Sequence, residues 1–217
     1  TNTGTDIIGG GGVYPIVFAE ESYEVHDAAT MWLQALFHVG RQTGAARWQA
    51  VMKSVIEHRR QGRPVLVGTR SIAASEHIAA LLAAAGIDHQ VLNAKQDQEE
   101  AATVALAGDA GRVTIATNMA GRGTDIKLDK AVCERGGLHV ILTELHDASR
   151  VDRQLAGRCA RMGDPGSWEE ILSLDDELVA NFLPPLRAWL LRRLSGDGTR
   201  GLWHLLALGF YRAAQWR

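Results

Sequence analysis

Short apolar runs alternate with longer amphipathic segments through the middle of the chain. Apolar runs bounded by turn-forming residues are typical of strands buried in a parallel sheet, and they lie at 64–68, 88–93, 112–117, 137–143 and 169–173. Segments of helical periodicity separate these runs, at 73–85, 99–107 and 151–162. Strands that alternate with helices form right-handed crossovers. The pattern therefore predicts an α/β fold, with a parallel sheet that carries helices on both faces.

The two ends of the chain show other patterns. Four consecutive glycines close residues 1–12, and such a run is costly to hold in regular structure, so we expect residues 1–44 to be poorly ordered or irregular. Helical periodicity nevertheless covers 28–38, and a firmer helix is predicted over 45–60. We expect the α/β domain to occupy 45–183. The tail, 184–217, is basic and aromatic, and it predicts two helices with an exposed apolar patch.

Composition and charge narrow the class of protein. The chain has 217 residues, 46% of them hydrophobic, which is enough for one domain with a core. Its net charge of −2 gives no general attraction to nucleic acid. The two cysteines form no disulfide framework and no zinc-site spacing, and no run approaches the roughly 18 apolar residues of a membrane span. We therefore expect a soluble protein of a reducing, intracellular compartment.

A row of polar side chains lies on the helix predicted around 151–162. Gln154, Arg158 and Arg161 are spaced i, i+4 and i+7, so on one helix they project as one row. Two guanidinium groups beside an amide suit a fixed anionic group such as a nucleotide phosphate. Taken alone, the row also fits a solvated face of a surface helix.

Three loops follow strands at the sheet edge where α/β folds bind ligands. In the loop at 117–126, Gly121 and Gly123 let the backbone approach a ligand closely. Arg122 offers charge there, and Asp125 can accept a hydrogen bond from a ribose hydroxyl or a metal-bound water. The alternative is a glycine-rich connection with an Asx turn, but this composition at a strand end favours a ligand site.

The other two loops are less specific. The loop at 68–71 runs into a helix that Ser71 can cap, and backbone N–H groups at such a helix start can hold an anion. The loop at 144–149 carries His146, which could contact a ligand. A hydrogen-bonded packing role is favoured for this histidine.

Five segments in order carry a family resemblance: 62–69, 91–95, 116–126, 136–139 and 154–166. Together they resemble the second nucleotide-binding domain of the SecA preprotein translocase ATPases, over roughly residues 46–180. The loop at 117–126 is the most specific of them. The resemblance implies a RecA-like fold and a motor in which two such domains sandwich ATP. It also implies a cytoplasmic location at the inner membrane, with a SecYEG-type translocon and preprotein as partners.

The resemblance also implies roles for individual residues. Arg158 and Arg161 would be arginine fingers that offset charge on the transferring phosphoryl group, and Gln154 would position the γ-phosphate or the attacking water. Asp125 would contact the sugar or metal environment of the nucleotide. Arg122 would couple its loop to the opposing domain.

Some of the family pattern is missing. Ala156, Cys159, Ala160 and Met162 replace an arginine, a serine, a glycine and a glutamine around the fingers. Neither a Gly-x-x-x-x-Gly-Lys-[Ser/Thr] loop nor an Asp-Glu-x-Asp box occurs. ATP and Mg²⁺ would therefore be held mainly by a first nucleotide-binding domain that this sequence does not contain. The sequence indicates part of a motor that is inactive alone.

Two alternatives stay open. The chain could be a non-catalytic remnant or interaction module, because the substitutions remove polar contacts around the fingers. It could also be the C-terminal half of a nucleic-acid helicase, although the acidic balance and the loop at 117–126 oppose this, and no nucleic-acid partner is expected. For the tail, the start of a helical scaffold is favoured over binding to an anionic membrane surface.

Overall fold

The predicted α/β class is confirmed. The computed structural model describes residues 13–15, 34–36, 44–92, 104, 106–117, 125–159, 163–180, 182–194 and 202–215. Five parallel strands form one sheet in the order β4-β5-β3-β6-β7. They are β3 (Val65–Thr69), β4 (Gln90–Leu92), β5 (Val113–Thr117), β6 (Leu138–Leu142) and β7 (Gly166–Glu170).

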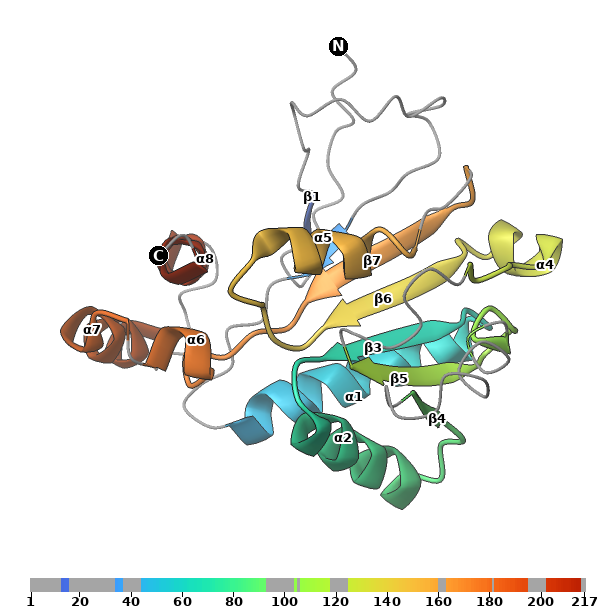
Figure 1. The fold of residues 1–217 in the computed structure, drawn as a ribbon, viewed down its shortest axis with the longest axis horizontal. Coiled ribbons are helices and arrows are strands. Elements are labelled where there is room, and N and C mark those ends of the chain that lie inside the picture. The colour runs from blue at the N-terminus through green and yellow to red at the C-terminus, as the bar shows by residue number, and fades with distance from the viewer. Residues whose placement is uncertain are drawn as a thin grey trace, which may run out of the picture.

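Both faces of this sheet are covered, as the sequence predicts. Helices α1 (Gly44–Arg60) and α2 (Ile72–Ala84) cover one face, and α5 (Ser149–Ala156) covers the other (Figure 1). Alternating strand residues enter the two cores: Val65 and Val67 pack with α1 and α2, whereas Leu66 packs with the core that includes α5. This alternation follows from the two-residue period of a strand.

The ends of α2 show why it forms where the sequence predicts it. The Ser71 hydroxyl accepts a hydrogen bond from the Ala74 N–H at 3.1 Å, which satisfies one of the free donors at the helix start. Gly86 has φ +66°, a left-handed conformation that ends the helix. The adjacent N–H of Ile87 donates to the Leu82 carbonyl at 2.9 Å.

Strand β7 lies three residues earlier than the predicted strand at 169–173. The predicted strand began at Glu169 and ran into the apolar pair that follows β7, whereas β7 begins at Gly166. In the structure Glu169 and Glu170 are 3% and 2% exposed. Glu169 lies 3.0 Å from His139 Nε2, and Glu170 accepts a hydrogen bond from Arg212 at 2.6 Å. Pairing allows both carboxylates to be buried in the strand.

The helix predicted around 151–162 is shorter than expected. Helix α5 ends at Ala156, with Gly157 as its C-cap. After it the backbone tightens into i→i+3 hydrogen bonds, from the Arg158 N–H to the Leu155 carbonyl at 3.1 Å and from the Cys159 N–H to the Ala156 carbonyl at 3.2 Å. The side chain of Arg158 therefore leaves from a turn, and a single helical row through 154–161 is wrong in its described part.

The N-terminal part is described at two short strands only. Strand β1 (Val13–Pro15) pairs antiparallel with β2 (Gln34–Leu36), so the helix predicted over 28–38 is wrong at Gln34–Leu36. The rest of residues 1–43 lies outside the described residues. Of the helix predicted over 99–107, Val104 and Leu106 are helical, and 99–103 and 105 are likewise outside.

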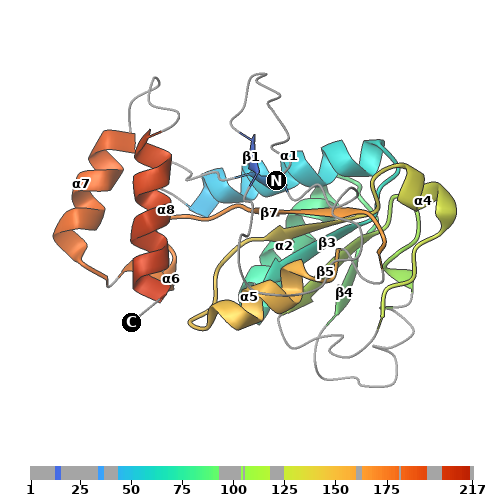
Figure 2. The same ribbon diagram turned by 90° about the horizontal axis from the view of Figure 1, so that it is seen from above.

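The tail forms the two predicted helices. Short helices α4 (Lys130–Glu134) and α6 (Glu177–Ala180) precede α7 (Pro184–Leu194) and α8 (Leu202–Gln215). Figure 2 shows α7 and α8 side by side, at the edge where the central strands end. Tyr211 is 1% exposed in the same core as α5, while Trp189 and Leu206 stay 40% and 44% exposed. No helix in the described ranges is long and apolar enough to span a bilayer.

Candidate functional site

Helix α5 is seated directly on the middle of the sheet. A Cβ atom added to Gly68 would lie 2.2 Å from Leu155 Cδ2, closer than any side-chain contact allows. Leu155 itself is 7% exposed. Because Gly68 is the fourth residue of the five-residue β3, this contact fixes α5 over the carboxyl half of the sheet. That is the edge at which α/β proteins bind their ligands.

The structure places part of the predicted site on this element. Gln154 is exposed on α5, and Arg158 is half-buried in the turn that follows it. Asp125 is half-buried in the segment after the β5 loop, beside the buried Ile126. The predicted residues Gly121, Arg122, Gly123 and Arg161 lie outside the described residues. The site is therefore described in part, through Gln154, Arg158 and Asp125.

A buried histidine–aspartate pair joins α5 to the end of β6. The Asp152 Oδ1 atom accepts hydrogen bonds from the His146 backbone N–H at 3.0 Å and from His146 Nδ1 at 2.7 Å. Both residues are buried, at 7% and 3% exposed. The prediction of a hydrogen-bonded packing role for His146 is confirmed at Nδ1. Its Nε2 atom is buried without a hydrogen-bond partner in the described part of the chain.

An ion network that no sequence pattern predicts lies at the same edge of the sheet. Arg47 of α1 lies 3.3 Å from Glu144, which follows β6, and pairs with Asp176, which follows β7. Burial raises the pKa of Glu144, and the positive charge of Arg47 opposes that shift. The network lines a cavity of about 350 Å³ together with Arg70, Ser71, Asp175 and Glu177. Residues 97 or more positions apart in sequence meet here, so no local pattern signals the network.

The glycine pair at 136–137 lies at the opposite end of the sheet, directly before β6. Gly136 and Gly137 have φ +97° and +66°, and a Cβ on Gly137 would lie 1.7 Å from the Pro165 carbonyl oxygen. Arg63 donates hydrogen bonds to both glycine carbonyls, at 2.8 and 3.0 Å, and to Ser167 Oγ at 2.6 Å. These glycines are therefore required by the backbone that enters β6.

One buried cluster has the composition of a metal site. His58, His139 and Glu169 place ligand atoms within 4.8 Å of one another. However, the two imidazole rings stack at 3.6 Å, so their in-plane lone pairs do not converge, and the Arg63 guanidinium lies 3.2 Å from His58 Nδ1. Burial, followed by the charges of His139 and Arg63, lowers the pKa of His58 to about 3. The arrangement suits two neutral imidazoles held by hydrogen bonds beside a guanidinium, and it disfavours a metal cation.

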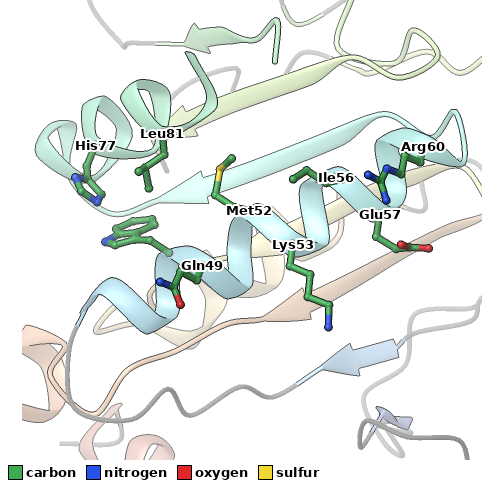
Figure 3. Close-up of a pocket in the computed structure, with 9 residues that line it drawn as sticks. Gln49, Met52, Lys53, Ile56, Glu57, Arg60, His77 and Leu81 are labelled. Atoms are coloured by element: carbon green, nitrogen blue, oxygen red, sulfur yellow. The ribbon is translucent and has the colours of Figure 1, made fainter. Parts of the chain in front are cut away.

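An apolar groove lies between α1 and α2, on the face away from α5 (Figure 3). It encloses about 630 Å³. Its side chains include Trp48, Met52, Ile56 and Leu81, with Gln49, Lys53, Glu57, Arg60 and His77 also lining it. The Trp48 ring packs against His77 at a centroid distance of 5.2 Å. One end of the groove adjoins the ion network at the carboxyl edge, because the Arg47 guanidinium lies 4.5 Å from the centre of the Trp48 ring.

Comparison with known proteins gives a consistent picture. A family model described as the SecA P-loop domain matches residues 39–131 and 127–195. A protein translocase subunit SecA 2 of Nitrosospira multiformis is 62% identical over 138 residues, which cover 64% of this chain and 21% of that protein. A SecA 3 of Magnetococcus marinus is 66% identical over 145 residues, 65% of this chain and 22% of that protein. The chain thus spans about a fifth of the length of these relatives.

Solved structures agree on the fold. The Escherichia coli DEAD-box protein SrmB, solved with a regulator of ribonuclease activity, has a TM-score of 0.51 and 19% identity, over 69% of this chain and 80% of that one. Domain 2 of the Mss116p DEAD-box helicase, bound to an RNA duplex, has a TM-score of 0.51 and 14% identity, over 66% and 56%. At such identities the likeness shows a RecA-like fold alone.

Proposed function

The chain belongs to the SecA family, and from this premise we propose that residues 45–183 act as the second nucleotide-binding domain of a SecA-like protein-translocation motor. The observation that carries the proposal is the packing of α5 on Gly68 of a RecA-like sheet through Leu155, with Gln154 exposed on this helix and Arg158 half-buried in the turn that follows it. The tail, 184–217, would then begin the helical scaffold of the motor.

The site acts on a nucleotide that a first, Walker-containing domain holds. ATP with Mg²⁺ supplies the phosphoryl group whose transfer drives the motor. Arg158 and Arg161 offset the charge that develops on this group, an effect worth on the order of 10³–10⁵ in turnover for arginine fingers. Gln154, exposed on α5, orients the γ-phosphate or the attacking water.

The loop after β5 completes the nucleotide contact. Gly121 and Gly123 allow close backbone approach, and Asp125 accepts a hydrogen bond from the sugar or from a metal-bound water. Arg122 couples this loop to the opposing domain. The described end of this loop fits the role. Asp125 is half-buried, next to the core residue Ile126 that anchors its segment.

The chain requires the first nucleotide-binding domain in order to hydrolyse ATP. It contains no phosphate-binding Walker loop, so by itself we expect it to hydrolyse no ATP. Joined to the first domain, it would couple ATP turnover to the movement of a preprotein through a SecYEG-type translocon, at the cytoplasmic side of the inner membrane.

Complementation tests the proposal. The 217-residue chain is mixed with a separately expressed first nucleotide-binding domain from the same genome, and ATP hydrolysis is measured for wild type and Arg158→Ala. We expect hydrolysis with the wild-type chain and a loss of at least about a hundredfold with the variant. Arg153→Ala, which removes an exposed arginine of α5, is the matched control and should retain activity. No hydrolysis with wild type, or equal rates for both variants, would refute the finger assignment.

A further inference from the structure

The last turns of α8 reach three buried carboxylates of the main domain. The Tyr211 hydroxyl donates to Asp176 at 2.5 Å, and Arg212 donates to Glu170 at 2.6 Å. Gln215 donates to Asp152 Oδ2 at 2.6 Å. The first two carboxylates belong to β7 and the segment after it, whereas Asp152 belongs to α5.

The amide of Gln215 is held in one orientation. Its Nε2 atom donates both to Asp152 and to the His146 backbone carbonyl, the latter at 2.7 Å. Its Oε1 atom accepts a hydrogen bond from Arg212 at 3.1 Å. Gln215 is 7% exposed and Asp152 is 3% exposed. Hydrogen bonds to a carboxylate are stronger than average, and they depend closely on the positions of donor and acceptor.

Asp152 connects Gln215 to the orientation of α5. Its other oxygen, Oδ1, is occupied by the backbone and ring of His146, at the end of the loop from β6. Asp152 lies in the first turn of α5, and Leu155, three residues later, rests on Gly68. Helix α5 has only eight residues, so a shift at Asp152 moves the whole element.

We propose that Gln215 is a positioning residue through which α8 sets the orientation of α5, and with it Gln154 and Arg158. The inference rests on the proposed nucleotide-binding function for the consequence, though not for the link itself. Gln215 joins α8 to α5 directly, through its hydrogen bond to Asp152. Movement of α8 by about an ångström would break its hydrogen bonds, because these require donor–acceptor distances near 3 Å. A displacement of α8 would thereby change the placement of Gln154 and Arg158.

Two variants separate the hydrogen bond from packing. Gln215→Met keeps the length and much of the volume of the side chain but removes the donor. Gln215→Glu keeps the shape and places a carboxylate against Asp152. Leu206→Met, at a 44% exposed position of the same helix, is the matched control.

Amide hydrogen exchange in the 217-residue chain tests the link. We expect amides of residues 153–157 to exchange at least about tenfold faster in Gln215→Met, faster again in Gln215→Glu, and unchanged in Leu206→Met. The proton on His146 Nδ1, followed by NMR, should lose protection in the same order. Wild-type exchange in Gln215→Met would overturn the proposal. Equal acceleration in α5 and β3 would also overturn it, because the contact would then support the whole core.

ATP hydrolysis with the first domain tests the consequence. We expect Gln215→Met to lower kcat several-fold with little change in KM for ATP, because a displaced finger loses contacts in the transition state. An unchanged kcat would overturn the control of Arg158 even if α5 loosens. If the wild-type pair hydrolyses no ATP, the proposed function fails, and the exchange experiment still decides whether Gln215 positions α5.

Discussion

Leu155 and Gly68 form the contact that places α5 on the sheet. The Leu155 Cδ2 atom occupies the space that any Cβ at position 68 would need, at 2.2 Å. Gly68 lies opposite Leu142 in the neighbouring β6, so the contact sits between two central strands. The glycine is thus needed for a close approach of side chain to backbone.

Gly68→Ala is expected to destabilise the chain by about 1–3 kcal/mol, the usual cost of overpacking a core. Leu155→Ala alone opens a cavity and should cost about 2–5 kcal/mol. In the double variant the new methyl group no longer meets the Leu155 side chain. The loss of stability in the double variant should therefore be smaller than the sum of the losses in the two single variants. Urea unfolding of all four proteins checks this. Strict additivity would contradict the contact.

Gly137→Ala and Gly163→Ala form a matched pair. Both glycines have positive φ, +66° and +88°, so alanine costs about 1–2 kcal/mol of backbone strain at either. At Gly137 the new Cβ would also lie 1.7 Å from the Pro165 carbonyl oxygen, whereas at Gly163 it meets nothing within 4 Å. We expect Gly137→Ala to be the more destabilising by at least about 2 kcal/mol in thermal or urea unfolding. Equal losses would mean that the approach to Pro165 relaxes at little cost.

The sheet could be predicted from the sequence because its signals are local. Apolar runs located β3, β5 and β6, and Ser71 and Gly86 marked the two ends of α2. The burial of Glu169 and Glu170 in β7 could not be predicted, because their partners lie 30 and 42 residues away. A carboxylate with a distant partner looks the same in sequence as a solvated one.

The residues of the candidate site could be predicted from the sequence, but their arrangement in space could be predicted only in part. The resemblance pointed to Gln154 and Arg158, and the structure places both on or just after α5. Their expected helical row depended on continuing the 3.6-residue period past Gly157, where the backbone instead forms a turn. The links from Asp152 to His146 and Gln215 span 6 and 63 residues, so only the fold reveals them as one network.

Nucleic acid is expected to bind weakly. The net charge of −2 offers no general electrostatic attraction to a phosphate backbone, although the fold resembles helicase domains. Fluorescence anisotropy with labelled single-stranded RNA should give no saturation at micromolar protein in about 150 mM salt. Tight binding that weakens steeply with salt would instead favour a helicase-like role.

Acid should destabilise the chain through His58. In the folded state the pKa of His58 is lowered to about 3, mainly by burial and then by the charges of His139 and Arg63, against 6.5 for an unperturbed histidine. Burial also lowers the pKa of His139. Between pH 6.5 and 3 the unfolded chain therefore binds more protons than the folded one, and the free energy of unfolding falls as pH decreases through this window. Above pH 6.5 both states are neutral at His58, so the contribution is fully present.

His58→Gln isolates this effect, because glutamine keeps a polar side chain beside Arg63 and does not titrate. The free energy of unfolding in urea, measured at pH 7.5, 6.5, 5.5 and 4.5, should fall less steeply with acid in the variant than in wild type. The variant is expected to be less stable at pH 7.5, since it loses the ring that stacks on His139 at 3.6 Å. The two stability curves should therefore converge as the pH is lowered. Parallel curves would show that His58 takes up its proton in the folded state as readily as in the unfolded one.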